Sequence, residues 1–150
     1  MESLFDEVAR RQLRQRIEAV TMASPRQWGS MSPAQMLAHC ALGMQMATGD
    51  LNPPRVFIGR VLGPLIKPLA LKDEAPMKRN SPTAPSLVVK DKRDLDEERQ
   101  RLLQLIERFA AAGPAACTTH PHAFFGRLTP EEWAKLMHKH LDHHLRQFNV

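Results

Sequence analysis

Tyrosine is absent from this chain of 150 residues, and aromatic residues make up only 5% of it. A surface that binds nucleic acid needs basic residues interleaved with aromatic side chains for base stacking, so this composition argues against a nucleic-acid-binding protein. Cysteine is scarce as well. Cys40 and Cys117 are too few for a disulfide framework or a cysteine zinc motif, and we interpret both as reduced, partly buried thiols.

Long hydrophobic runs are also missing. No stretch approaches the roughly 18 apolar residues that a membrane span requires. The acidic start, residues 1–7, lacks the basic region and apolar core of a signal peptide. We therefore expect a cytoplasmic protein with no membrane partner. The length and the 43% apolar content predict one globular domain over residues 1–150.

Positive charge is in modest excess, because the formal net charge is +5. Most of the basic residues alternate with acids, which is typical of solvated helix faces rather than of a basic stripe. Lys78 and Arg79 are candidates for holding an anionic cosubstrate, although the sequence favours solvated side chains at both positions.

Helical periodicity is present in four segments, residues 2–22, 32–48, 91–112 and 129–148. Two of them begin with the same signature. Ser32 and Thr129 are each followed by Pro at the first helical position and by Gln or Glu where it completes a capping box. The sequence therefore predicts an all-α four-helix bundle with a long crossover between its second and third helices.

That crossover is rich in proline and apolar rather than polar. Residues 52–85 hold seven prolines, and residues 55–66 form an apolar run that predicts a short helix. After Pro68 we expect mostly irregular chain, with residues 78–85 extended across the surface. Crossovers of this length in compact domains are often lids or binding loops, so we expect this one to be packed against the domain.

The final helix concentrates the histidines, with four of the seven in the chain. At 100° per residue His140 and His144 fall inside its apolar face, His143 on the edge of that face and His138 toward the polar side. Two imidazoles one turn apart can bind one cation, because side chains at i and i+4 stack on the same face. They can equally be two core histidines hydrogen-bonded to neighbours.

A third histidine bears on that choice. His39 lies at the flank of the apolar face of the 32–48 helix, and Gly43 leaves space one turn away for a neighbouring helix or for a ligand. Helix bundles place metal sites in their cores from side chains on facing helices. His39 would therefore converge with His140 and His144 if these two helices are neighbours.

The placement of these histidines resembles a known pattern. A histidine on the second helix, then His-x-x-x-His followed by Gln on the last helix, is typical of the DinB-like (DinB/YfiT) superfamily. The matching residues here are His39, His140, His144 and Gln147. The chain is closer still to one uncharacterised bacterial branch of that superfamily. Its similar stretches are Trp28–His39, Asn80–Pro85, Phe124–Trp133 and Lys139–Phe148.

The resemblance implies a four-helix bundle with a divalent metal site whose ligands are His39, His140 and His144. Some relatives are thiol-dependent S-transferases that use low-molecular-weight thiols, and others resemble amidohydrolases or isomerases. Relatives often form dimers, so a homodimer is also implied. This branch brings no assigned activity with it, and the superfamily name does not establish a role in DNA repair.

Three neutral imidazoles would leave a zinc-like ion at least one open position, as in catalytic sites. Zn²⁺ and Ni²⁺ both suit nitrogen ligands. Our leading hypothesis is a metal-dependent transferase or hydrolase that activates a thiol or water and acts on a small molecule. Gln147 would support the histidine ligands, and His122, in the 115–128 loop, is the candidate for an acid/base role. The competing hypothesis is a non-catalytic bundle that binds a metal or a ligand.

Overall fold

The computed structural model describes residues 2–72 and 76–150, and these are almost entirely helical. The helices are α1 (Glu7–Ala19), α2 (Pro33–Thr48), α3 (Phe57–Lys72), α4 (Leu95–Ala112) and α5 (Pro130–Gln147), with short 3₁₀ turns η1 (Pro85–Leu87) and η2 (Pro114–Ala116). Over the described ranges there is no strand, and a single isolated bridge joins His122 to Gly126. The all-α class is therefore confirmed, but the α-helices number five rather than four.

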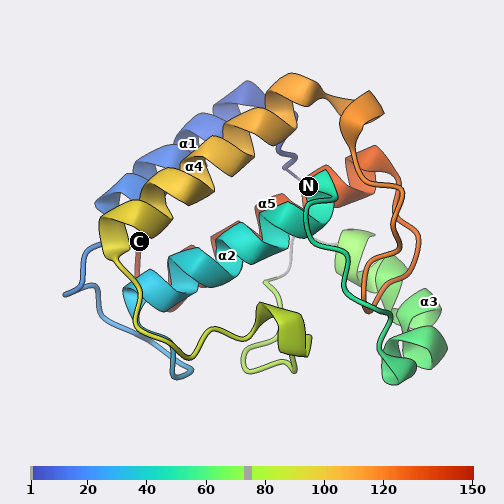
Figure 1. Ribbon diagram of the computed structural model, residues 1–150, viewed down its shortest axis with the longest axis horizontal. Helices are drawn as coiled ribbons and strands as arrows, with labels where there is room; N and C mark the ends of the chain where they lie inside the picture. The colour runs from blue at the N-terminus through green and yellow to red at the C-terminus, as the bar shows by residue number, and fades with distance from the viewer. Residues whose placement is uncertain (1, 73–75) are drawn as a thin grey trace.

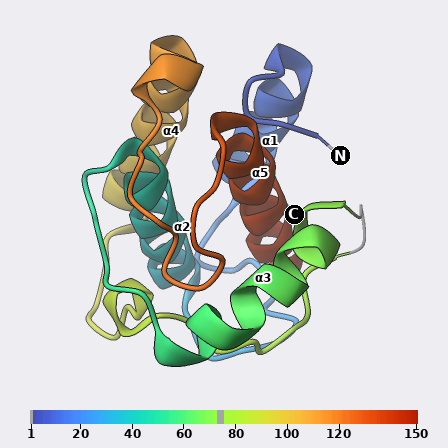
Figure 2. The same ribbon diagram turned by 90° about the vertical axis from the view of Figure 1, so that its right-hand side faces the viewer.

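Four of the helices pack in a ring. α2 packs against α4 and α5, and α1 packs against the same two helices on the other side. Figures 1 and 2 show these four side by side, with α3 lying crosswise outside the ring, in contact with α5. The core between them contains fully buried side chains from every one of the four: Leu13, Ile17, Met36, Leu37, Met44, Leu102, Trp133, Leu141 and Leu145.

Local signals set the helix ends correctly where a capping box is present. Both Ser32 and Thr129 accept a hydrogen bond from the third helical N–H, and the Gln35 and Glu132 side chains accept one in return from the cap residue. The first and third predicted helices begin later than expected. Asp6 and Asp94 accept bonds from the backbone N–H groups that follow them, and each caps a helix that the periodicity alone had started earlier.

The crossover helix α3 differs from the prediction in length, because it continues past Pro68 to Lys72. Each proline inside it lacks the N–H that would bond four residues back. The residues four positions earlier, Arg60 and Pro64, are both exposed, so water can reach the carbonyls that lose this bond. Residues 76–84 form no regular element, as expected. No helix in the described ranges is long and apolar enough to cross a membrane.

Two glycines of α3 let the helix pack closely against the loop that precedes α5. Among residues 57–71 of α3, Gly59 and Gly63 are the buried ones, and both contact the backbone of Phe124. A Cβ at Gly59 would lie 2.7 Å from the Phe124 carbonyl oxygen, and one at Gly63 would overlap that atom. Lys67 adds an ion pair of 2.9 Å to Glu132. The helix therefore turns its small residues inward and leaves its large apolar residues on the outside.

Candidate metal centre

Three histidines that the sequence singled out are brought together between α2 and α5. His39, His140 and His144 each offer a ring nitrogen, and these nitrogens all lie within 4.8 Å of one another. The ring centroids are 4.6–4.9 Å apart in all three pairs. They meet because α2 and α5 are neighbours, as the prediction required.

The outward nitrogen of His39 is held by backbone. Its Nδ1 lies 2.8 Å from the carbonyl oxygen of Leu87 in η1. A carbonyl can only accept, so Nδ1 carries the proton and Nε2 presents a lone pair on the opposite side of the ring. The irregular crossover thus fixes the tautomer of a histidine on α2.

His144 is fixed by a relay of two hydrogen bonds. The Nε2 of Gln147 donates to the carbonyl oxygen of Trp28 over 2.8 Å, and this orients the amide. The amide oxygen Oε1 then lies 2.8 Å from Nδ1 of His144, which must be the donor. His144 Nε2 is left with its lone pair. Partners of this kind on the non-ligating nitrogen are typical of histidines that bind metal.

His140 completes the group from one turn earlier on α5. Its Nε2 lies 3.0 Å from Nε2 of His39, and its Nδ1 is buried without a hydrogen-bond partner. Gly43 explains how the ring fits. A Cβ at that position would lie 3.2 Å from Cε1 of His140, so the space that the sequence indicated beside His39 is filled by the neighbouring helix.

Burial keeps these imidazoles neutral. It lowers the pKa of His39, and it lowers that of His144 to about 3, with the positive form of His39 as the next cause. The pKa of His140 is lowered well below 6.5 by burial and then by His144 and His39. Neutral imidazole is the form that ligates metal, so the cluster needs no deprotonation near pH 7.

The donor set fits a divalent ion such as Zn²⁺. Tetrahedral zinc with bonds of about 2.0–2.1 Å places its ligand nitrogens about 3.3 Å apart, close to the 3.0 Å between the Nε2 atoms of His39 and His140. In the part of the chain that the structure describes, no Asp, Glu or Cys joins the group. A set of three imidazoles leaves a coordination position open.

Cys40, next to His39 in sequence, is not part of the site. It is buried, its thiol contacts the sulfur of Met36, and burial raises its pKa. Cys117 is half-buried and its pKa is raised too. Both cysteines are unpaired thiols, and their raised pKa values make them poor nucleophiles.

His122, the candidate acid/base residue, closes the loop before α5. Its Nδ1 accepts hydrogen bonds of 3.1 Å from the backbone N–H groups of Phe124 and Phe125, and its ring packs against Trp133. Burial and the charge of Arg55 lower its pKa to about 4. The ring is therefore neutral near pH 7. Its role in acid/base chemistry stays a prediction.

His138 differs from the sequence prediction, which placed it toward the polar side of the last helix. It is only 7% exposed. The segment before α1 covers it, because the Leu4 N–H donates to the carbonyl of Ala134 and Glu2 lies 3.5 Å from the His138 ring. Helix periodicity could not show this, since the cover comes from the other end of the chain.

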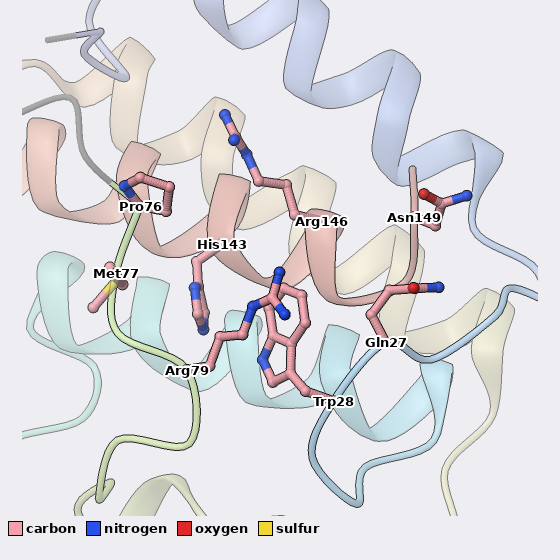
Figure 3. A pocket seen from close by; sticks show the side chains of 8 residues that line it. All are labelled: Gln27, Trp28, Pro76, Met77, Arg79, His143, Arg146 and Asn149. Atoms are coloured by element: carbon pink, nitrogen blue, oxygen red, sulfur yellow. The ribbon is translucent and has the colours of Figure 1, made fainter.

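A pocket of about 290 Å³ lies beside the cluster. It is lined by Trp28, Arg79, His143 and Arg146 among others, and Figure 3 shows these side chains around it. The ring of His143 lies 5.0 Å from that of His144 and 5.3 Å from that of Trp28, so it separates the pocket from the three histidines. Arg79 lines the pocket, whereas Lys78 is exposed outside it.

Trp28 has two roles beside the site that the sequence analysis did not predict. The carbonyl of Trp28 holds Gln147 and its ring lines the pocket. A signal was available in the glycine that follows. Gly29 has φ +77°, and a Cβ there would lie 2.6 Å from the Gln147 amide nitrogen, so the Trp-Gly pair is shaped around that amide.

Comparison with known proteins gives one family. The chain belongs to the family described as "Protein of unknown function (DUF1569)", whose model matches residues 6–150. No curated protein and no solved structure matches the chain. The expectation of a family without an assigned function is confirmed, and the site rests on the geometry described above.

Proposed function

We propose that the protein is a divalent-metal-dependent enzyme that uses His39, His140 and His144 as ligands and acts on a small molecule. The observation that supports this most is the orientation of the rings. The Nδ1 atoms of His39 and His144 are both engaged as donors by groups outside the cluster, so each ring keeps an Nε2 lone pair. A cation would take the place of the 3.0 Å contact between Nε2 of His39 and Nε2 of His140. A histidine that is merely buried in a core does not need a ring nitrogen close to those of two other histidines.

Transferase or hydrolase chemistry fits this donor set best. A bound divalent ion would supply Lewis acidity, which lowers the pKa of a coordinated water or low-molecular-weight thiol so that a nucleophile forms near pH 7. The protein's own residues hold the ring tautomers, through Leu87 and Gln147, and exclude water from one side of the site. Zn²⁺ and Ni²⁺ are the ions that we propose.

We place the chain within the DinB-like superfamily on the same residues. One ligand comes from α2 and two come from α5, and a long crossover that includes α3 separates α2 from α4. The resemblance implied these three ligands in a four-helix bundle, and the ligand positions are what support the proposal. The cytoplasmic location and the lack of nucleic-acid binding stay predictions.

The test is elemental analysis of untagged protein, comparing the wild type with His39→Ala, His140→Ala and His144→Ala. We expect close to one Zn²⁺ or Ni²⁺ per wild-type chain, natively or after loading, and a large loss in each variant. His120→Ala is the matched control. His120 is a histidine outside the cluster whose ring bonds to the Pro53 carbonyl, and its removal should leave the metal content unchanged.

A wild-type protein that cannot be loaded with either ion would contradict the metalloenzyme proposal. The three rings would then be a buried polar cluster in which Nε2–H of His140 donates to His39, and the search would turn to ligands of a non-catalytic bundle. Metal that is bound but leaves no coordination position open to an added thiol would favour the same non-catalytic alternative.

We also propose that the partner of the outer face of α3 is a second copy of this chain. Seven large apolar residues of α3 are 37–82% exposed: Phe57, Ile58, Val61, Leu62, Leu65, Ile66 and Leu69. Together they form an exposed apolar face along one helix, and apolar faces of this kind mark interaction sites in soluble proteins.

Two cations of this region are bonded to the protein itself, whereas Arg60 on α3 is exposed. Lys67 is paired with Glu132, and Arg55 donates to the carbonyls of Gly59 and Phe124. Both point toward the protein's own loop. A helix that binds a membrane surface needs free cations flanking its apolar face. Lys67 and Arg55 are not available for that role. The seven exposed apolar residues are all uncharged, so this face can pack against its own copy across a two-fold axis.

A further inference from the structure

We propose that the pocket between Trp28, Arg79 and Arg146 binds the carboxylate or phosphate group of a small-molecule ligand. The anion would anchor that ligand next to His143, on the side of the cluster where Trp28 lies. The binding step stands on the pocket alone, whereas its use to position a substrate rests on the proposed metal-dependent function.

The side chains of the pocket that are ionised near pH 7 are all positively charged. Arg79 and Arg146 line it together with the amides of Gln27 and Asn149, and no acid is among its lining residues. Asp142 lies outside the lining, 2.8 Å from Nε of Arg146, and holds that guanidinium at the edge of the pocket. Guanidinium forks and amide N–H groups are the donors that recognise carboxylates and phosphates.

Arg79 is pre-organised by stacking. Its guanidinium carbon lies 4.2 Å from the centroid of the Trp28 ring, a cation–π contact. In the described ranges no acid forms an ion pair with it. Figure 3 shows the guanidinium lying over the indole. Stacking uses the face of the guanidinium plane, so its N–H edge remains available for two parallel bonds to an oxyanion.

The pocket is connected to the histidine cluster at two places. Trp28 contributes its ring to the pocket and its carbonyl to Gln147, which bonds His144. His143 lines the pocket with its ring 5.0 Å from that of His144. A ligand whose oxyanion bonds to Arg79 would therefore lie against His143, whose ring stands between the pocket and the cluster.

The size of the pocket limits the ligand. A volume of about 290 Å³ is at the low end of the roughly 300–1,000 Å³ that small-molecule sites occupy. It suits a short carboxylic acid or a phosphorylated fragment and is too small for a folded partner. The small molecule expected from the sequence would therefore be an anion.

The experiment is a titration of the full-length protein with succinate and, separately, with inorganic phosphate, at constant ionic strength, followed by tryptophan emission. Trp133 is buried in the core, so a change on binding reports Trp28. We expect a saturable change with at least one of the two anions and none with neutral succinamide. The anion that saturates at the lower concentration identifies the group, carboxylate or phosphate.

Arg79→Gln should weaken the binding by at least tenfold, while Lys78→Gln should leave it unchanged. The two substitutions remove the same charge from adjacent positions, and only Arg79 lines the pocket. A response that never saturates, or that weakens equally in both variants, would overturn the proposal, because it would reflect general attraction to a basic protein. Repeating the titration on His140→Ala separates the two proposals, since the pocket needs no metal in order to bind the anion.

Discussion

Gln147 joins the pocket side of the molecule to a proposed metal ligand through two hydrogen bonds. Its amide donates to the Trp28 carbonyl and accepts from Nδ1 of His144, both over 2.8 Å. It is only 3% exposed, so water cannot replace either bond without a rearrangement. The ring of His144 therefore depends on Gln147 for both its tautomer and its orientation.

Gln147→Ala should lower the affinity for Zn²⁺ by about 10–100-fold, the usual effect of removing a hydrogen-bond partner from a metal-binding histidine. The measurement is competition against a chromophoric zinc chelator. Gln104→Ala, at an exposed position of α4, is the control for losing a glutamine. Equal zinc affinity in the two variants, with both folded by circular dichroism, would remove Gln147 from the site.

At the scale of the element, the loop that leads into α5 is held closed by a neutral histidine. His122 pairs its backbone with Gly126, and its Nδ1 accepts from two further backbone N–H groups. Protonation of the ring would remove that acceptor. Burial, and then Arg55, lower the pKa of His122 to about 4, against 6.5 for an ordinary histidine.

Because of this difference in the pKa of His122, the free energy of unfolding falls in acid. Above about pH 6.5 His122 is neutral in both the folded and unfolded chains, and its contribution is complete. Between about pH 6.5 and pH 4 the unfolded chain takes up the proton first, so the free energy of unfolding declines by up to roughly 3 kcal/mol. His122→Asn keeps an acceptor for the two N–H groups and cannot be protonated.

Denaturant unfolding of the metal-free protein at pH 7.5 and pH 5.0 measures the effect. The loss of stability between the two pH values should be about 2 kcal/mol smaller in His122→Asn than in the wild type. Parallel losses in the two proteins would show that the loop histidine does not titrate in this range. The other buried histidines are common to both proteins and cancel in the comparison.

At the scale of the whole molecule, the outer face of α3 should decide the oligomeric state. The wild type is expected to have twice the 17.0-kDa chain mass in light scattering after gel filtration. Leu65→Glu/Leu69→Glu should be monomeric, because it places two charges in each copy of the proposed interface. Leu65 and Leu69 are 74% and 77% exposed, so the fold should tolerate both changes.

The matched control is Val8→Glu/Met22→Glu, which changes two exposed apolar residues outside α3. It should remain a dimer. A wild type that is monomeric at tens of micromolar would contradict the proposed interface. Sedimentation of that monomer with anionic vesicles would then assign the apolar face to a membrane surface instead.

The sequence by itself determined the elements whose signals are local. The Ser-Pro-x-Gln and Thr-Pro-x-Glu boxes placed the starts of α2 and α5 to the residue, because a cap is made by side chains within one turn. The i, i+4 spacing placed His140 and His144 on one face of α5, because helix geometry alone sets that relation. His39 and Gln147 were named from the resemblance to a family pattern together with their helix positions.

The tertiary structure decided what depends on distant parts of the chain. That α2 and α5 are neighbours, so that His39 meets the other two rings, follows from core packing. The burial of His138 comes from the N-terminal segment, about 130 residues away in sequence. α3 exposes its large apolar residues and buries its glycines, which is the reverse of the usual amphipathic helix. The reason is that the glycines fit against the loop at Phe124, where no larger side chain can. Such contacts join residues that no local pattern relates.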